Sequence, residues 1–177
     1  MSRELLKQRC QEASASWLEA QGPIQLAQAI GRQAGLPVVL QDHPWLRQAA
    51  EHLLPDRADG VHIAGASGLI PATAVDTAVV VGLGAVPTTG SVLVAGRTWA
   101  DWRLTLCPRR LVVVIPAARA ALTLAEALDS TAQEPAGLVS WLTGPSRTAD
   151  IEKVLVLGAQ GAAELVVILY TSGPGPA

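Results

Sequence analysis

Short apolar runs separated by Gly and Pro residues constrain the fold more than any other feature of this sequence. They lie at Val61–Ala64, Ala78–Val81, Ser91–Ala95, Leu111–Ile115, Leu138–Leu142 and Leu165–Tyr170. Continuous runs of Val, Ile, Leu and Ala are typical of strands covered on both faces of a sheet. Helical spacing of apolar residues occurs between the runs, most strongly over residues 117–128. Strands that alternate with helices predict an α/β fold.

The residues before Gly60 predict mainly helices. An apolar stripe at helical spacing predicts a helix over residues 3–20; its members are Leu6, Cys10, Ala13 and Trp17. Further helices are expected over about residues 23–34 and 44–54, with a short strand at 37–40 between them. Asp42 is a candidate cap for the helix that follows it.

Length and charge limit the organisation of the chain and its partners. We expect an N-terminal helical segment over residues 1–60, an α/β core over 61–171 and a flexible tail over 172–177. The net charge is −2, and the longest basic run is Arg109-Arg110, so the footprint of a nucleic-acid binder is absent. No apolar run approaches the roughly 20 residues that cross a bilayer. We therefore expect a cytoplasmic protein without membrane insertion.

The two cysteines indicate neither a metal site nor a redox site. Cys10 and Cys107 are far apart in the sequence and match no ligand spacing. An iron–sulfur cluster requires several cysteine ligands, so this chain does not hold one alone. We expect no metal and no cofactor on this chain.

Two motif-like segments lack the residues that would make them specific. Val79–Pro87 resembles a strand that enters a dinucleotide-binding loop, but Pro87 stands in place of the third glycine. A turn that needs small residues is the alternative interpretation. Gly65–Leu69 resembles a nucleophile elbow, but Leu69 stands where glycine is required. The histidines have no triad or metal spacing, and we expect them on the surface or on helix faces; they are His43, His52 and His62.

The segment Thr88–Val94 is a candidate anion site. Gly90 lies between Thr89 and Ser91, just before an expected strand. Free backbone N–H groups and hydroxyls in such a turn bind phosphate or carboxylate. Alternatively, the hydroxyls bond their own backbone in a hairpin turn.

The segment 142–151 is the most distinctive stretch of the sequence. Gly144 and the proline after it turn the chain, and Ser146 or Thr148 would cap a following turn. Arg147 offers a planar set of donors that suits a carboxylate or phosphate. Asp150 would orient Arg147 or accept a hydrogen bond from a ligand hydroxyl. An internal Arg147–Asp150 pair that only holds the loop is an equally good interpretation.

These two segments carry a resemblance to a known family. T-G-P-S-R-T-A-D-I-E at 143–152, followed by V-L-V-L-G and E-L-V-V-I-L, resembles the C-terminal signature of the LUD (lactate-utilisation) domain family, in its lactate utilisation protein C branch. T-T-G-S-V-L-V at 88–94, then Arg103 and C-P-R-R-L-V-V-V-I-P, is similar to its middle signature. The resemblance covers about residues 75–170. Thr88 replaces the family's usual Glu, and Gln160 lies where the family usually has a histidine, so any chemistry of those two residues is in doubt.

The resemblance implies a fold and a function. The fold would be a Rossmann-like three-layer sandwich similar to that of the NagB/RpiA/CoA-transferase group. The protein would be an accessory subunit of an L-lactate oxidation system that acts with iron–sulfur protein partners. It would bind an anionic ligand or a partner through the two signatures, at Thr89, Gly90, Ser91, Gly144, Ser146, Arg147, Thr148 and Asp150. The alternative is a stand-alone enzyme of the same fold group that acts on a sugar phosphate or a CoA ester.

Overall fold

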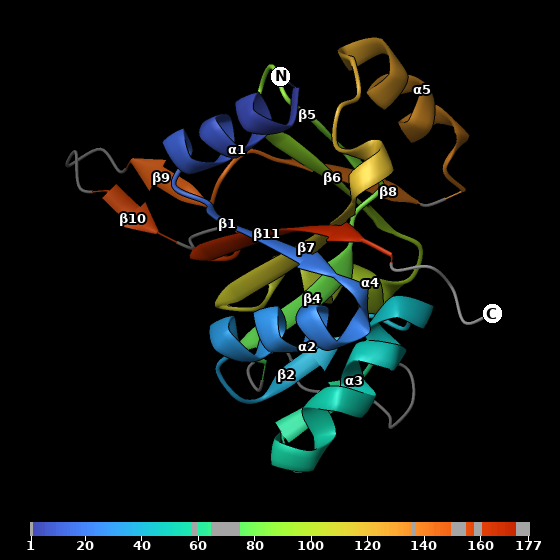
Figure 1. Ribbon diagram of the computed structural model, residues 1–177. Helices are drawn as coiled ribbons and strands as arrows, with labels where there is room; N and C mark the ends of the chain where they lie inside the picture. The colour runs from blue at the N-terminus through green and yellow to red at the C-terminus, as the bar shows by residue number, and fades with distance from the viewer. Residues whose placement is uncertain are drawn as a thin grey trace.

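A parallel sheet with helices on both faces forms the centre of the molecule (Figure 1). The computed structural model describes residues 2–57, 60–64, 75–135, 137–149, 155–157 and 161–172. Within these ranges the central sheet has six strands in the order β1-β11-β7-β4-β2-β3, all paired in parallel. This arrangement confirms the expected Rossmann-like three-layer α/β fold.

All strands of this sheet except β1 follow apolar runs of the sequence. Their bounds are β1 (Ser16–Gln21), β2 (Val38–Leu40), β3 (Val61–Ile63), β4 (Thr77–Val81), β7 (Arg110–Pro116) and β11 (Glu164–Thr171). The middle of β7 is fully buried from Leu111 to Ile115, between β11 and β4. Burial on both faces explains why its sequence is continuously apolar rather than alternating.

Two helices cover one face of the sheet. They are α2 (Gly22–Gln33) and α3 (Pro44–Arg57), which confirm the second and third expected helices. Leu26 and Ile30 of α2 and Leu46 of α3 are completely buried against the sheet. The side chains that the sheet contributes to this core include Val112 and Ile168.

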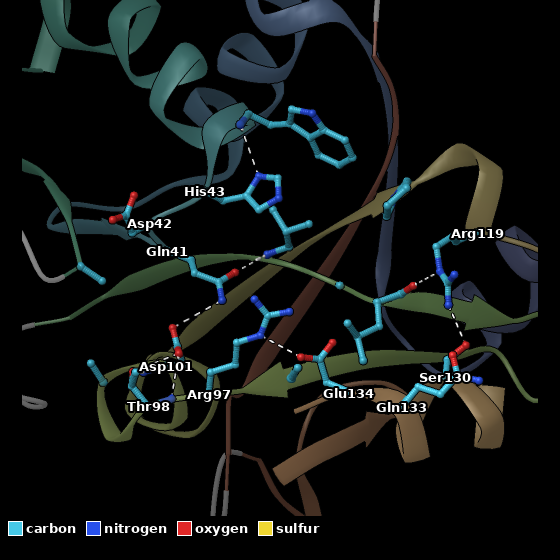
Figure 2. Close-up of a pocket in the computed structure, with 18 residues that line it drawn as sticks. Gln41, Asp42, His43, Arg97, Thr98, Asp101, Arg119, Ser130, Gln133 and Glu134 are labelled. Atoms are coloured by element: carbon cyan, nitrogen blue, oxygen red, sulfur yellow. Dashed lines mark hydrogen bonds and ion pairs between the residues drawn. The ribbon is translucent and has the colours of Figure 1, made fainter. Parts of the chain in front are cut away.

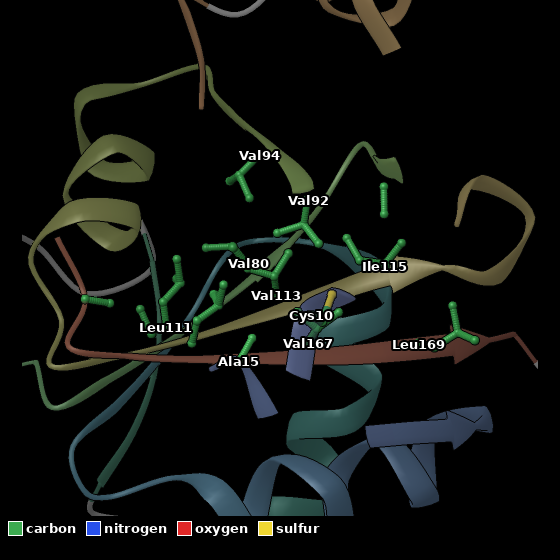
Figure 3. Packing of buried hydrophobic residues seen from close by; sticks show 14 of the residues in the cluster. Cys10, Ala15, Val80, Val92, Val94, Leu111, Val113, Ile115, Val167 and Leu169 are labelled. Carbon is green, nitrogen blue, oxygen red and sulfur yellow. The ribbon is translucent and has the colours of Figure 1, made fainter. Parts of the chain in front are cut away.

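The other face carries helices and a second, smaller sheet. Helices α1 (Ser2–Glu12) and α4 (Trp99–Leu106) lie here with the antiparallel strands β5 (Gly84–Val86), β6 (Ser91–Gly96) and β8 (Leu138–Leu142). In the packing of this layer, Cys10 of α1 inserts among valines of the central sheet (Figure 3). The helix α5 (Leu124–Gln133) packs on the outside of the smaller sheet, and β9 (Arg147–Ala149) pairs with β10 (Leu155–Leu157) in a hairpin.

The expected helix over residues 3–20 is wrong in its second half. Helix α1 ends at Glu12, and Ser14 adopts a φ of 65°, which breaks the helix. The following residues form β1, which pairs with β11. The apolar spacing continued past the break because Trp17 is partly buried in the strand. The N-terminal 60 residues therefore supply not only helices but also strands β1 and β2 of the central sheet.

The expected helix over residues 117–128 is also misplaced. Residues Ala117–Arg119 form a short 3-10 turn, η3, and α5 begins only at Leu124. Thr123 and Glu126 form a reciprocal capping box, which sets that start. Leu124 and Leu128, which lie in the apolar register of the expected helix, are each 54% exposed. No helix in the described ranges is long and apolar enough to cross a membrane.

Candidate functional site

An open cavity of about 760 Å³ lies at the carboxyl ends of the parallel strands. It is lined by residues at or just after the ends of β2, β4 and β7, namely Gln41, Gly82 and Pro116. The chain runs outward from β2 to β3 and then returns to β4 on the other side of β2. Ligands of open α/β sheets bind at such a reversal point, beyond the carboxyl ends of the strands. We call this hollow the carboxyl-edge cavity.

Gln41 holds one wall of the carboxyl-edge cavity in place. Its side-chain oxygen accepts a hydrogen bond from the backbone N–H of Val81, at 2.9 Å, and its amide nitrogen donates to Asp101 Oδ1, at 3.4 Å. Asp101 also closes the capping box of α4 with Thr98. The end of β2, the end of β4 and the start of α4 are thus tied together by one side chain.

His43 projects into the cavity in its neutral form (Figure 2). Its Nδ1 accepts a hydrogen bond from the backbone N–H of Trp45, at 3.3 Å, so the proton of the neutral ring lies on Nε2. His43, and not Asp42, therefore caps α3, because the Asp42 carboxylate is engaged by Arg47. Burial lowers the pKa of His43, and the positive charge of Arg97 lowers it further, while Asp42 opposes both.

Two arginines line the cavity, and they are anchored to helix α5 and to its C-terminal cap residue (Figure 2). Arg97 follows β6, and its Nε donates to Glu134 Oε1 at 2.7 Å. Arg119 lies in η3; its Nε donates to the carbonyl of Leu83 at 2.5 Å and its Nη2 to Ser130 Oγ at 2.7 Å. Within the described part of the chain, no hydrogen bond occupies the Nη groups of Arg97 or Nη1 of Arg119. These N–H groups are donors available to an anion.

The structure brings the two signature segments together, away from this cavity. Thr89 Oγ1 donates to Ser91 Oγ at 2.8 Å, and Ser91 Oγ shares a hydrogen bond of 2.7 Å with Thr143 Oγ1. Ser91 is 5% exposed. The hydroxyls of the two signatures therefore bond to each other, which supports the interpretation of this segment as a turn.

The glycines of both signatures pack against the end of helix α1. Gly90 has a φ of 69°, and a Cβ there would lie 2.7 Å from the Cβ of Arg9. Gly144 has a φ of 81°, and a Cβ there would lie 2.2 Å from the carbonyl oxygen of Ala13. Arg147 Nη2 donates to the same carbonyl at 3.2 Å. These positions require glycine because the backbone of α1 approaches them closely.

Arg147 lies at the amino-terminal edge of the central sheet. Its exposed side chain lines a smaller hollow of about 410 Å³ with Ser14, Ser16 and Glu164, which precede or begin β1 and β11. The backbone N–H of Ser146 donates to Ala162, and Thr148 lies in β9. Asp150 and Gln160 lie outside the described residues, so their predicted roles stay predictions.

The remaining motifs contribute packing. A Cβ at Gly82 would lie 2.4 Å from Ile115 Cδ1, and one at Gly84 would lie 2.6 Å from Leu122 Cδ1. Small residues are therefore required where β4 passes into β5, as the turn interpretation predicts. The elbow-like segment 65–69 lies outside the described residues. Among those described, no three His, Cys, Asp or Glu side chains gather as a metal site requires.

Sequence reasoning missed the residues of the carboxyl-edge cavity. Gln41 and His43 follow a buried strand directly, and Arg97 follows another. A polar residue just after an apolar run is the available signal, because the carboxyl ends of parallel strands meet at one edge of a sheet. Arg119 carries no such signal, because the turn that holds it was expected to be helical.

The fold and the cavity define a Rossmann-like α/β protein with an open polar hollow at the position where such folds bind small molecules. The chain belongs to the LUD domain family, whose sequence profile matches residues 72–170. That family is associated with lactate utilisation. A similar solved structure is the crystal structure of a DUF162 family protein from Deinococcus radiodurans, with a TM-score of 0.70 and 18% identity over 96% of each chain. No curated protein matches the sequence.

Proposed function

We propose that this protein is an accessory subunit of an L-lactate oxidation system, and that it binds an anionic ligand in the carboxyl-edge cavity. Membership of the LUD domain family supports the role in lactate utilisation. The observation that carries the ligand is the pair Arg97 and Arg119, which line one cavity with donors that no described residue occupies. A guanidinium presents planar pairs of N–H groups that match the oxygens of an anion.

The surface around Gly90, Gly144 and Arg147, which we call the signature surface, has a separate role in this proposal. Arg147 is exposed beside the end of α1, and it uses one hydrogen bond to hold that helix. We assign to this surface the contact with iron–sulfur partner proteins that carry the electrons. Cys10 is buried, and burial raises the pKa of its thiol to about 11, which disfavours the thiolate form that a cluster needs. A metal ligand has to be a thiolate.

An anaerobic affinity purification from the native host tests the assembly. The tagged protein is expected to bring Cys-rich partners with iron–sulfur absorbance, and the eluate to reduce a dye when lactate is added. The Arg147→Ala variant is expected to lose the partners while keeping its fold, as measured by circular dichroism. Arg47→Ala is the control, since Arg47 is also exposed but pairs with Asp42 near the opposite edge of the sheet. A colourless, solitary wild-type protein without lactate-dependent activity would contradict the accessory role.

A specific observation favours a second candidate, a stand-alone enzyme that acts on a sugar phosphate or a CoA ester. The cavity is larger than a small hydroxy acid requires, and the neutral His43 has a ring nitrogen suited to proton transfer. Turnover of such an ester by the isolated protein, lost in the His43→Gln variant, would support this candidate over the first.

A further inference from the structure

We propose that the ligand of the carboxyl-edge cavity is a phosphate ester of about mononucleotide size. Its phosphate lies between Arg97 and Arg119, and its ring lies against the wall formed by His43 and Trp45. The proposal rests on the proposed function only in placing an anion in this cavity, and it holds whether or not the protein acts in lactate oxidation.

The size of the cavity favours a ligand larger than a small hydroxy acid. Cavities of about 300 to 1,000 Å³ bind ligands of drug size. The carboxyl-edge cavity has about 760 Å³, so a molecule as small as lactate would leave most of it filled with water.

Both arginines present free donors to the same cavity. Arg119 is held by Ser130 of α5, and Arg97 is held by Glu134, the C-terminal cap residue of α5. Figure 2 shows the Nη groups of Arg97 turned toward the open centre of the cavity, with Arg119 across from them. Donors that approach from two sides suit a tetrahedral group with several terminal oxygens better than a planar carboxylate, which a single guanidinium satisfies.

The carboxylates that line the cavity already have partners within the protein, so their negative charge does not prevent an anion from binding. Glu134 accepts from Arg97, and its side chain is only 9% exposed. Asp101 accepts from Thr98, and Asp42 is held by Arg47. Each negative charge is thus neutralised or capped within the protein.

The opposite wall is aromatic. The rings of His43 and Trp45 meet edge to face with centroids 5.0 Å apart, and the ring of Trp45 packs on Tyr170 at 4.9 Å. Tyr170 is buried and supports Trp45 from behind. A rigid ring wall on one side and two guanidiniums on the other fit a ligand that has a planar ring at one end and a phosphate at the other.

Isothermal titration of the isolated full chain tests the proposal with four probes: ADP, ribose 5-phosphate, inorganic phosphate and L-lactate. ADP is expected to bind at least tenfold more tightly than phosphate or lactate. Equal affinities for ADP and ribose 5-phosphate would show that the wall formed by His43 and Trp45 does not bind the ring of the ligand. Binding of lactate without binding of any phosphate probe would overturn the phosphate assignment while leaving the proposed function intact.

Titration of variants that remove the charge of each arginine is the second test. Arg97→Gln and Arg119→Gln are each expected to weaken ADP binding about ten- to a hundredfold, because each removes charged donors. Arg9→Gln, another exposed arginine paired with a glutamate, is expected to leave it unchanged. Glu134→Gln releases Arg97 and removes a negative charge, so ADP is expected to bind several-fold more tightly. Thermal unfolding of each variant checks the fold. ADP binding that survives both arginine changes would overturn the site.

Discussion

At the scale of single residues, the positions that look most distinctive in the sequence are those that hold the fold. Gly90 and Gly144 lie where the end of helix α1 presses on the chain, and Thr89, Ser91 and Thr143 bond to one another. The arginines of the cavity, which have free donors, are single polar side chains outside any sequence motif. Spacing in the sequence therefore identified the tightest contacts rather than the cavity.

The backbone of Arg9 lies close to Gly90, so a single methyl group added at Gly90 is expected to lower the free energy of unfolding strongly. Gly90→Ala combines a left-handed φ of 69° with a contact of 2.9 Å to the carbonyl carbon of Arg9. We expect the free energy of unfolding to fall by about 3 kcal/mol. Gly137→Ala is the control, because nothing lies within 4 Å of the added carbon, and its change is expected to stay within about 0.5 kcal/mol. Urea unfolding measures both, and equal losses would contradict the packing argument.

The lowered pKa of His43 predicts a loss of stability in mild acid. The unfolded chain takes up a proton at this histidine near pH 6.5, whereas the folded chain does so only at lower pH. Protonation therefore favours the unfolded state, and the free energy of unfolding falls as the pH drops from about 6.5 through the folded pKa. Urea midpoints at pH 7 and pH 5 are expected to differ less in His43→Gln than in the wild type. His52→Gln, on the exposed side of α3, is the control substitution.

At the scale of elements, strands were easier to predict than helices. Each apolar run became a strand, and burial on both faces explains the continuous apolar residues of β4, β6, β7 and β11. Helix limits depend on single caps, and the capping boxes at Thr98 and Thr123 begin α4 and α5 where apolar spacing did not suggest a start. Helix α5 lies on the outside with only Ala127 buried, so the pattern of apolar residues does not indicate which face of the helix packs on the protein.

That outer position predicts a contrast between two leucines in helices. Leu128 of α5 is 54% exposed, whereas Leu46 of α3 is completely buried. Leu128→Ala is expected to lower the free energy of unfolding by less than about 1 kcal/mol, and Leu46→Ala by about 2 to 5 kcal/mol. Urea unfolding of the two variants makes the comparison. A loss at Leu128 as large as that at Leu46 would show that α5 packs against another surface in solution.

At the scale of the whole molecule, the cavity and the signature surface lie at opposite edges of one sheet. The seven residues of β7 span about 23 Å between these edges. The cavity draws on residues from segments far apart in the sequence, including Gln41, Arg97 and Arg119. Only the order of the strands brings them together, and no local pattern in the sequence predicts that order.

This separation predicts that the two surfaces act independently. The effects of Arg97→Gln and Arg147→Ala are expected to add within about 0.5 kcal/mol, because sites more than about 10 Å apart without shared partners rarely couple. Urea unfolding of the single and double variants measures the sum, and titration with ADP should give one affinity with or without the Arg147 change. A coupling above about 1 kcal/mol would show that ligand and partner binding communicate through the sheet.

The pairing of β1 with β11 has a consequence for how the chain folds during synthesis. Ser16 lies opposite Val166, so neighbouring positions in the sheet are 150 residues apart in the chain. At about 5 to 20 residues per second, a ribosome needs roughly 8 to 30 s to make the second partner after the first. Strand β1 lacks its partner throughout that interval, the side of β7 that receives β11 stays open from the synthesis of β7 onward, and unpaired strand edges invite association with other chains. The nascent protein is therefore most exposed to aggregation, and most in need of a chaperone, just before its final strand leaves the ribosome.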